Sequence, residues 1–376
     1  MSARPCVPGV TIRRVTSLRE FDDLTDVWRR LTHATGQICP LLSHDWFACC
    51  WRTAGPNRRR EVWVCEEAGQ PVAFVPLVHA RVRALGVPVR VIGFLGTAVT
   101  PLVDMPVAGA ADHIATALIA ELRSRHDWDV VSLPNVRATS MIGKALMAAL
   151  PGALPWSASP GVATPFVTIS GTWDDFVRAR HGDVVAAWTR AADSIARRGA
   201  IAVEEHRQVD PDGPIFRDLV EVSWAAWPHV GRLATSGSEA ASRFLRELTR
   251  RASCNGWLRL WMLRVDGRPV ATEYQLGANG SVHTVRADHD PSLREHAADV
   301  YLRMRIVQSL FERGDIHEYD LPAATAETSA LFSGRHETVT LEVYAPTALG
   351  RLLHRLDRHG RPLARRLRGA LAEWQE

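Results

Sequence analysis

The sequence has 376 residues, of which 46% are hydrophobic and 23% charged, and its formal net charge is +4. This length favours two globular domains, and so small a net charge does not by itself indicate nucleic-acid binding. The six cysteines lack C-x-x-C spacing and no apolar run approaches the ~18 residues of a membrane span, so we expect a cytoplasmic protein with no disulfide framework and no stable membrane insertion.

The first half of the chain alternates predicted strands and helices. Ser17 and Ser43 each precede an apolar-periodic segment, and we expect both to act as helix N-caps. Prolines and glycines crowd residues 151–165, which we interpret as a connection between domains. Strands are predicted over 10–14, 62–66, 71–79, 89–94 and 130–133, with helices after Ser17, after Ser43 and over 111–125.

The second half continues in the same manner and ends in a basic helical tail. Its predicted strands cover 166–170, 201–206, 257–265, 269–276, 282–287, 318–321 and 339–343. Its predicted helices cover 172–198, 219–227, 238–252, 299–313 and 325–333, and the tail begins at residue 348.

The two halves repeat each other. The stretch 62–73 recurs at 260–271, about 198 residues later, with Trp, Gly, Pro, Val and Ala at matching places. Each copy predicts two strands joined by a tight turn, in which Gly69 and Gly267 take positive φ. Because helices and strands follow in the same order in both halves, we infer a tandem duplication of one α/β unit.

Three groups of residues, in this order, resemble a known family. They are Ser43-His44-Asp45-Trp46-Phe47 with Gly69-Gln70-Pro71-Val72-Ala73, then Ser223-Trp224 with Arg243-Phe244-Leu245, then Gly256-Trp257-Leu258 with 266–271 and Tyr319-Asp320-Leu321. Together they resemble the CelD/BcsL-type group of the GNAT acyltransferase superfamily, which is similar to the Fem-like aminoacyltransferases. The resemblance spans about residues 12–345.

This resemblance implies an α/β fold with tandem GNAT-like domains, the fold of acyl-CoA N-acyltransferases, in which helices flank mixed sheets. We expect an N-terminal domain over 10–160 on the structural or acceptor side, and a C-terminal domain over 165–345 with the donor and catalytic site. A basic C-terminal helix is expected over 346–376.

The resemblance also implies an enzyme that transfers an acyl group from a thioester to an amine by direct attack. The donor, acyl-CoA or an acyl-carrier protein, is a co-substrate, and no permanently bound cofactor is expected. The family holds the donor pyrophosphate at a helix start, which here lies near Asp299. The residues assigned to this role are Arg294, Ala297, Ala298 and Arg303.

Two departures from the family pattern concern this donor site. Ala297-Ala298-Asp299 replaces a Ser-Pro-Gly-like turn, and an acidic N-cap at Asp299 would repel a pyrophosphate. No lysine follows the segment 319–321, where the family has Tyr-Lys. Either the donor differs from ordinary CoA, or arginines such as Arg294 and Arg303 supply the phosphate contacts.

An amine acceptor arrives as ammonium and needs a base. The candidate catalytic residues are Glu273, His283, Asp288 and Tyr319, the last as general acid for the leaving thiolate. Each has a plainer interpretation as a solvated or packed residue. The resemblance suggests Asp104 as lining for an acceptor cleft, and Trp224 is assigned to substrate binding or to packing. The spacing of Asp288-His289-Asp290 and Glu295-His296 is too loose for a metal site, so no metal is expected.

Arginines surround the leucines of the tail. This pattern fits a solvated face over an apolar stripe, or a docking face for an acyl-carrier protein, a tRNA or a membrane surface. Two alternatives to a thioester-dependent N-acyltransferase therefore stay open: a Fem-like aminoacyltransferase that uses aminoacyl-tRNA, and a degenerate GNAT scaffold that binds without turnover. The tail arginines are Arg351, Arg355, Arg358, Arg361, Arg365, Arg366 and Arg368.

Overall fold

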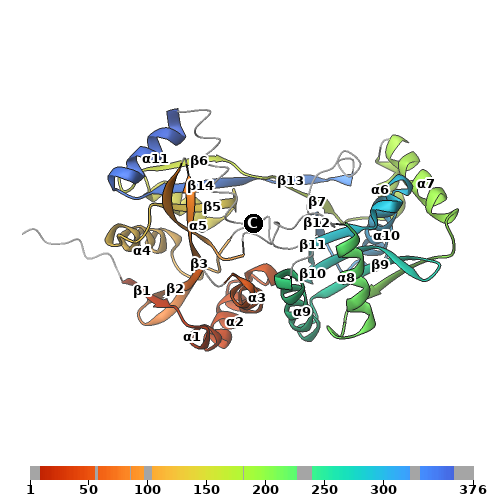
Figure 1. Cartoon of the computed structure of the whole chain (residues 1–376), viewed down its shortest axis with the longest axis horizontal. Coiled ribbons are helices and arrows are strands. Elements are labelled where there is room, and N and C mark those ends of the chain that lie inside the picture. The colour runs from red at the N-terminus through yellow and green to blue at the C-terminus, as the bar shows by residue number, and fades with distance from the viewer. Residues whose placement is uncertain are drawn as a thin grey trace, which may run out of the picture. The chain divides into compact units, whose positions relative to one another are not determined.

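The computed structural model describes residues 9–55, 58–84, 86–96, 104–180, 182–226, 239–321 and 331–359. The chain divides into two compact units, the first formed by residues 1–163 and 337–376 and the second by 164–336 (Figure 1). None of the helices in the described ranges combines the length and apolarity that crossing a bilayer requires.

The first unit is built on a seven-stranded mixed sheet in the order β1-β2-β3-β4-β5-β14-β6. Neighbouring strands are antiparallel except β4 and β5, which are parallel. The strands are β1 (Val10–Val15), β2 (Arg59–Glu67), β3 (Gln70–Ala84), β4 (Val87–Phe94), β5 (Val130–Arg137), β6 (Trp156–Pro160) and β14 (Thr338–Tyr344). The helices are α1 (Leu18–Asp22), α2 (Thr25–Ala34), η1 (Pro40–Leu42), α3 (His44–Thr53), α4 (Ala111–Ser124), α5 (Met141–Ala149) and α11 (Ala348–His359).

The second unit has a sheet of the same design, in the order β13-β7-β12-β11-β10-β9-β8, with β11 and β12 as its parallel pair. The strands are β7 (Thr164–Thr168), β8 (Ile201–His206), β9 (Leu258–Val265), β10 (Arg268–Ala278), β11 (Ser281–His289), β12 (Glu318–Asp320) and β13 (Gly334–His336). The helices are α6 (Trp173–Arg178), α7 (Gly182–Ala196), α8 (Pro214–Ala226), α9 (Glu239–Cys254), η2 (Pro291–His296) and α10 (Ala298–Arg313).

Read from β1 or from β8, both sheets have four antiparallel strands, one parallel step and two further antiparallel strands. This shared order confirms the duplicated α/β unit. The repeated hairpins also match, because Ala68-Gly69 (φ 49° and 75°) and Asp266-Gly267 (φ 49° and 79°) both take the two positive φ values of a type I′ turn.

One boundary differs from the expected domains. Strand β14 pairs with β5 and β6 of the first unit, although its residues were expected in a domain over 165–345. The corresponding position in the second sheet is occupied by β7, which lies at the N-terminal end of the domain expected over 165–345. Residues 337–345 therefore belong to the first unit, as does α11.

Local capping signals position the helices as the sequence predicts. Ser17 and Glu20 form a reciprocal capping box, and Ser43 Oγ accepts a hydrogen bond from Trp46 N at 3.0 Å. Two predicted helices are interrupted: the one after Ser17 divides into α1 and α2, and the one over 172–198 into α6 and α7. The helix predicted over 325–333 lies largely outside the described residues.

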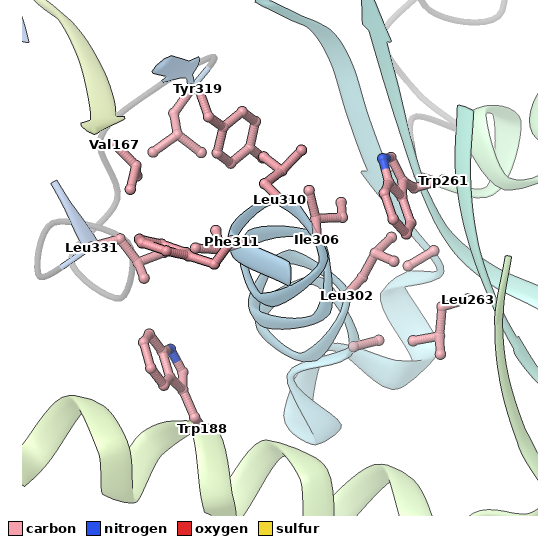
Figure 2. Packing of buried hydrophobic residues seen from close by; sticks show 14 of the residues in the cluster. Val167, Trp188, Trp261, Leu263, Leu302, Ile306, Leu310, Phe311, Tyr319 and Leu331 are labelled. Carbon is pink, nitrogen blue, oxygen red and sulfur yellow. The ribbon is translucent and has the colours of Figure 1, made fainter. Parts of the chain in front are cut away.

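The core of the second unit surrounds α10 (Figure 2). Leu302, Ile306 and Leu310 are at most 3% exposed and lie on the side of α10 that packs against Trp261 and Tyr319 of the sheet. Burial of such a side chain stabilises a fold by roughly 1.5–3 kcal/mol, so α10 is firmly anchored.

Candidate active site in the second unit

Strands β11 and β12 pair over a short stretch and then part. The parallel register joins Ser281 to Glu318, Val282 to Tyr319 and His283 to Asp320. Strand β11 continues to His289, whereas β12 ends at Asp320. Among the described strands, none pairs with this side of β11 beyond His283. The parting therefore leaves backbone groups at the strand edge that an extended ligand can use.

Helix α10 begins close to this point in the chain, after β11 and η2. Its N-cap is Ala297, in the left-handed region at φ 50°, and no described side chain caps the helix start. Asp299 was expected at the N-cap, but it lies within the first turn. A helix start without a side-chain cap keeps backbone N–H donors and a partial positive charge for an anion.

The donor-binding residues whose side chains the structure describes do not form one group. Ala297 and Ala298 lie at the helix start, where Ala298 is fully buried. Arg303 lies further along α10 and is buried, with its Nε 3.6 Å from Glu273 Oε2. The side chain of Arg294 is outside the part of the chain that the structure describes. Arg303 is therefore directed at a carboxylate of the sheet.

A β-bulge decides which side chains share a face of β11. Tyr274 lies opposite Arg286 and Gln275 opposite Thr284, so Val285 is the extra residue on β11. An extra residue reverses the alternation beyond it. His283, Arg286 and Asp288 consequently lie on one face, the face that α8 covers, whereas Thr284 lies on the face that α10 covers.

On the α8 face, Asp288 is held by two partners. Its Oδ2 accepts a hydrogen bond from Ser223 Oγ of α8 at 2.7 Å, and Arg286 donates to both carboxylate oxygens. Asp288 is 5% exposed, so this pairing takes place in a largely dry environment.

His283 forms a dyad with Asp320 on the same face. The two side chains are buried, and His283 Nδ1 lies 2.7 Å from Asp320 Oδ2. Burial alone would raise the pKa of Asp320, but hydrogen bonds from His283 and His336 outweigh it and hold the pKa well below its usual range. Since an ionised carboxylate only accepts, Nδ1 of His283 carries a proton in this bond, and in the neutral imidazole Nε2 is then the basic nitrogen.

Glu273 and Tyr319 lie on the opposite face, under α10. Glu273 Oε1 accepts from Gln275 Nε2 at 2.8 Å, from Thr284 Oγ1 at 2.9 Å and from the Tyr319 hydroxyl. Burial, and then the charge of Glu273, raise the pKa of Tyr319 well above its usual value. The structure thus groups Glu273 and Tyr319 with Arg303, and separates them from His283 and Asp288 by the thickness of the sheet.

The two residues assigned to substrate binding belong to different units of the chain. Asp104, in the first unit, accepts a hydrogen bond at 2.8 Å from Ser140, the N-cap of α5, and burial raises its pKa. Trp224 follows the inward-facing Ser223 on α8 and is 54% exposed, so its ring is not part of the core.

The sequence analysis did not single out Asp320, His336 or Ser223 as site residues. Glu318 and Asp320 alternate on a short strand, which could have indicated two carboxylates on one face. For His336 no local pattern was available, because its contact with Asp320 reaches from an edge strand across β7.

The first unit lacks the dyad. The matching registers equate His283 with Gly93, and Asp320 with Ser132. The matching hairpins equate Glu273 with Val75. The ionisable groups at the parting of the strands are therefore present in the second unit and absent from the equivalent described positions of the first.

Comparison with known proteins agrees with this architecture. Residues 180–328 match the family model described as an acetyltransferase (GNAT) domain. No curated protein matches the sequence. Nothing in these comparisons bears on the CelD/BcsL-type group, which stays a prediction.

Three of the solved structures with TM-scores above 0.5 illustrate what this chain is similar to. FemX has 9% identity and a TM-score of 0.53, over 91% of this chain and 100% of that one. The C-terminal domain of a putative lysylphosphatidylglycerol synthetase from Agrobacterium fabrum has 14% identity and a TM-score of 0.51, over 90% and 95%. L-PGS from Bacillus licheniformis has 14% identity and a TM-score of 0.51, over 91% and 97%. Because these sequence identities are low, the comparisons show a shared fold and not a shared activity.

Proposed function

Because the second unit carries a GNAT acetyltransferase domain within a tandem GNAT-like fold, we propose that the protein is an N-acyltransferase. It moves an acyl group from a thioester donor, acyl-CoA in the first place, to a small amine. The observation that carries this proposal is the parting of β11 and β12 after His283, followed in the chain by the uncapped start of α10.

The donor binds along the parted strands. Its pantetheine amides pair with the edge of β11 beyond His283, and its pyrophosphate lies against the backbone N–H groups that follow Ala297. Asp299 in the first turn weakens this anion site without capping it. No arginine among the described side chains is needed for the contact, since the helix start itself supplies donors.

The acceptor amine approaches from the α8 face. On the α10 face, buried residues such as Tyr319 and Leu302 fill the space beside the strands, whereas the α8 face carries the polar His283, Arg286 and Asp288. Once the ammonium has lost one proton, its nitrogen attacks the thioester carbonyl carbon, the C–N bond forms and the C–S bond breaks, and the thiolate takes up the second proton that the nitrogen releases. His283 Nε2 accepts the proton that the ammonium loses, and Asp320 orients the imidazole.

A second candidate donor is aminoacyl-tRNA, in which an ester replaces the thioester. The similarity in fold to FemX and to the lysylphosphatidylglycerol synthetases favours it. Helix α11 adds Arg351, Arg355 and Arg358 as phosphate contacts. An acyl-carrier protein would deliver a thioester without the CoA pyrophosphate, and so without the contact at the start of α10.

A binding experiment with a matched control tests the proposal. Thermal denaturation is followed with CoA, acetyl-CoA and a long-chain acyl-CoA, since a donor at ~100 times its Kd adds roughly 2.7 kcal/mol of stability. Ala297→Asp places a charge at the start of α10 and should weaken binding, whereas Ala110→Asp, at the equivalent N-cap of α4 in the first unit, should not. If no CoA species binds, the CoA proposal fails, and salt-dependent binding of aminoacyl-tRNA then becomes the measurement that decides for the second donor.

A further inference from the structure

Glu318 and Asp320 of β12 and His336 of β13 bring their ligand atoms close together. His336 Nε2 lies 3.1 Å from Asp320 Oδ1 and 3.2 Å from Glu318 Oε1, and all three atoms lie within 4.8 Å of one another. We propose that Glu318, Asp320 and His336 form a binding site for a divalent transition-metal ion, with Zn²⁺ as the reference ion. The proposal does not depend on the acyltransferase activity.

Two of the three spacings in this cluster fit ligands that share one ion. Protein nitrogen and oxygen ligands bind Zn²⁺ at about 2.0–2.2 Å, which places two of them roughly 3.0–3.5 Å apart across angles between octahedral and tetrahedral. The distances from His336 to the two carboxylates fall within this interval. Three protein ligands leave the remaining positions of the ion to water.

The fold holds each ligand in place. Glu318 and Asp320 are separated by one residue of β12 and so point to the same face. The imidazole of His336 stacks on the ring of Phe166, with ring centroids 4.5 Å apart. Gly334 makes room for that ring, because a Cβ at this position would approach it to 2.7 Å. The imidazole is therefore aimed across β7 at the carboxylates of β12.

The charge of the cluster favours a cation. Two carboxylates face one imidazole, and Asp320 is 3% exposed, so its negative charge is largely removed from water. The other oxygen of Asp320 contacts His283 Nδ1 at 2.7 Å, the kind of outer contact that orients a ligating carboxylate. Glu318 and His336 are only partly buried, which gives an ion access from solvent.

The cluster is not a requirement of the sheet itself. The register of the first unit places Val130 and Ser132 where the second unit has Glu318 and Asp320. A set of one imidazole nitrogen and two carboxylate oxygens suits Zn²⁺, Mn²⁺ or Co²⁺ better than Mg²⁺ or Ca²⁺, whose sites are built from oxygen ligands. The ion would link β12 to β13 across β7 and neighbour the proposed base through Asp320.

The test measures metal binding and needs no substrate. Tag-free full-length protein is stripped with EDTA and titrated calorimetrically with ZnCl₂ and MnCl₂, and bound metal is counted after dialysis. We expect one ion per chain, bound at least about tenfold more weakly by His336→Gln and by Glu318→Gln. His206→Gln is the control, because among the described residues His206 forms a similar histidine–carboxylate contact with a single carboxylate, Glu204 of β8.

Two results would overturn the site. One is the absence of saturable binding of either ion by the unmodified chain, which would mean that His336 is simply an ion-paired histidine. The other is unchanged affinity in both ligand variants, which would place the ion elsewhere. Circular dichroism of the stripped proteins checks folding, and the partly exposed Glu318 keeps the test usable if His336→Gln unfolds. CoA binding is measured on the same samples, so failure of the metal site is distinguished from failure of the proposed function.

Discussion

The buried carboxylate of Glu273 allows a sharp separation between structural and catalytic roles. Glu273→Gln keeps the shape of the side chain and an oxygen that can accept from Thr284, but it removes the charge that faces Arg303 at 3.6 Å. Arg303 then becomes a buried cation that has lost its main carboxylate partner, since Asp299 contributes less to stabilising its charge. Breaking one partner of a buried ion pair costs about 3–5 kcal/mol, which is a large part of the 5–15 kcal/mol that stabilises a typical domain.

Urea denaturation followed by circular dichroism measures this cost. With a slope of about 1–3 kcal/mol per molar urea, we expect Glu273→Gln to lower the midpoint by at least about 1 M. The double variant Glu273→Gln/Arg303→Met removes both charges and should recover most of the loss. Glu312→Gln, at an exposed position of α10, is the matched control and should have little effect.

The opposite pattern would refute this reasoning. If Glu273→Gln is as stable as the parent protein and loses acyl transfer while donor binding persists, Glu273 is a catalytic base and the network with Arg303 is secondary. Equal destabilisation of the single and the double variant would show that the Arg303 charge is not the cause. The assay thus decides between two roles for the same carboxylate.

Two further predictions concern the dyad and the first unit. His283→Gln should lower kcat by about 10²–10⁴-fold while the affinity for CoA stays the same. The rate is measured as the release of free thiol from acyl-CoA with a panel of amines. An unchanged kcat would show that His283 is not the base. Burial, and then the charge of Glu342, raise the pKa of Tyr344, whereas an unfolded tyrosine ionises near pH 10. Only the unfolded state then loses this proton above pH 10, so the free energy of unfolding should fall by about 1.4 kcal/mol per pH unit from this group, and Tyr344→Phe should reduce that slope.

The sequence predicted those features of the fold that local chemistry dictates. The repeated hairpins depend on Gly69 and Gly267 at positive φ, and the helix caps depend on the hydroxyls of Ser17 and Ser43. The hairpins and the caps can therefore be predicted from the local sequence. Strand β8 has the predicted bounds, 201–206. The tandem arrangement followed because two copies of one pattern support each other.

Tertiary register explains what the sequence did not predict. A strict period of two places His283 and Asp288 on opposite faces of β11, and the bulge at Val285 brings them to the same face. The local sequence around residue 285 contains no signal that predicts this bulge. Likewise, the contact of His336 with Asp320 depends on β7 lying between β12 and β13 in the sheet. Strand composition does not determine this order, because strands of similar composition can occupy the same position in a sheet.

The position of β14 has a consequence for how the protein is made. Glu342 on β14 pairs with Ser132 on β5, 210 residues earlier in the chain, so the first sheet stays incomplete until residues 338–344 have left the ribosome. The second unit is continuous from 164 to 336 and can fold as soon as it emerges. We therefore expect the second unit to complete its fold before the first, the reverse of the usual N-terminal-first order during synthesis. A chain truncated before 338 should retain a folded second unit and an N-terminal half with an open, aggregation-prone edge at β5.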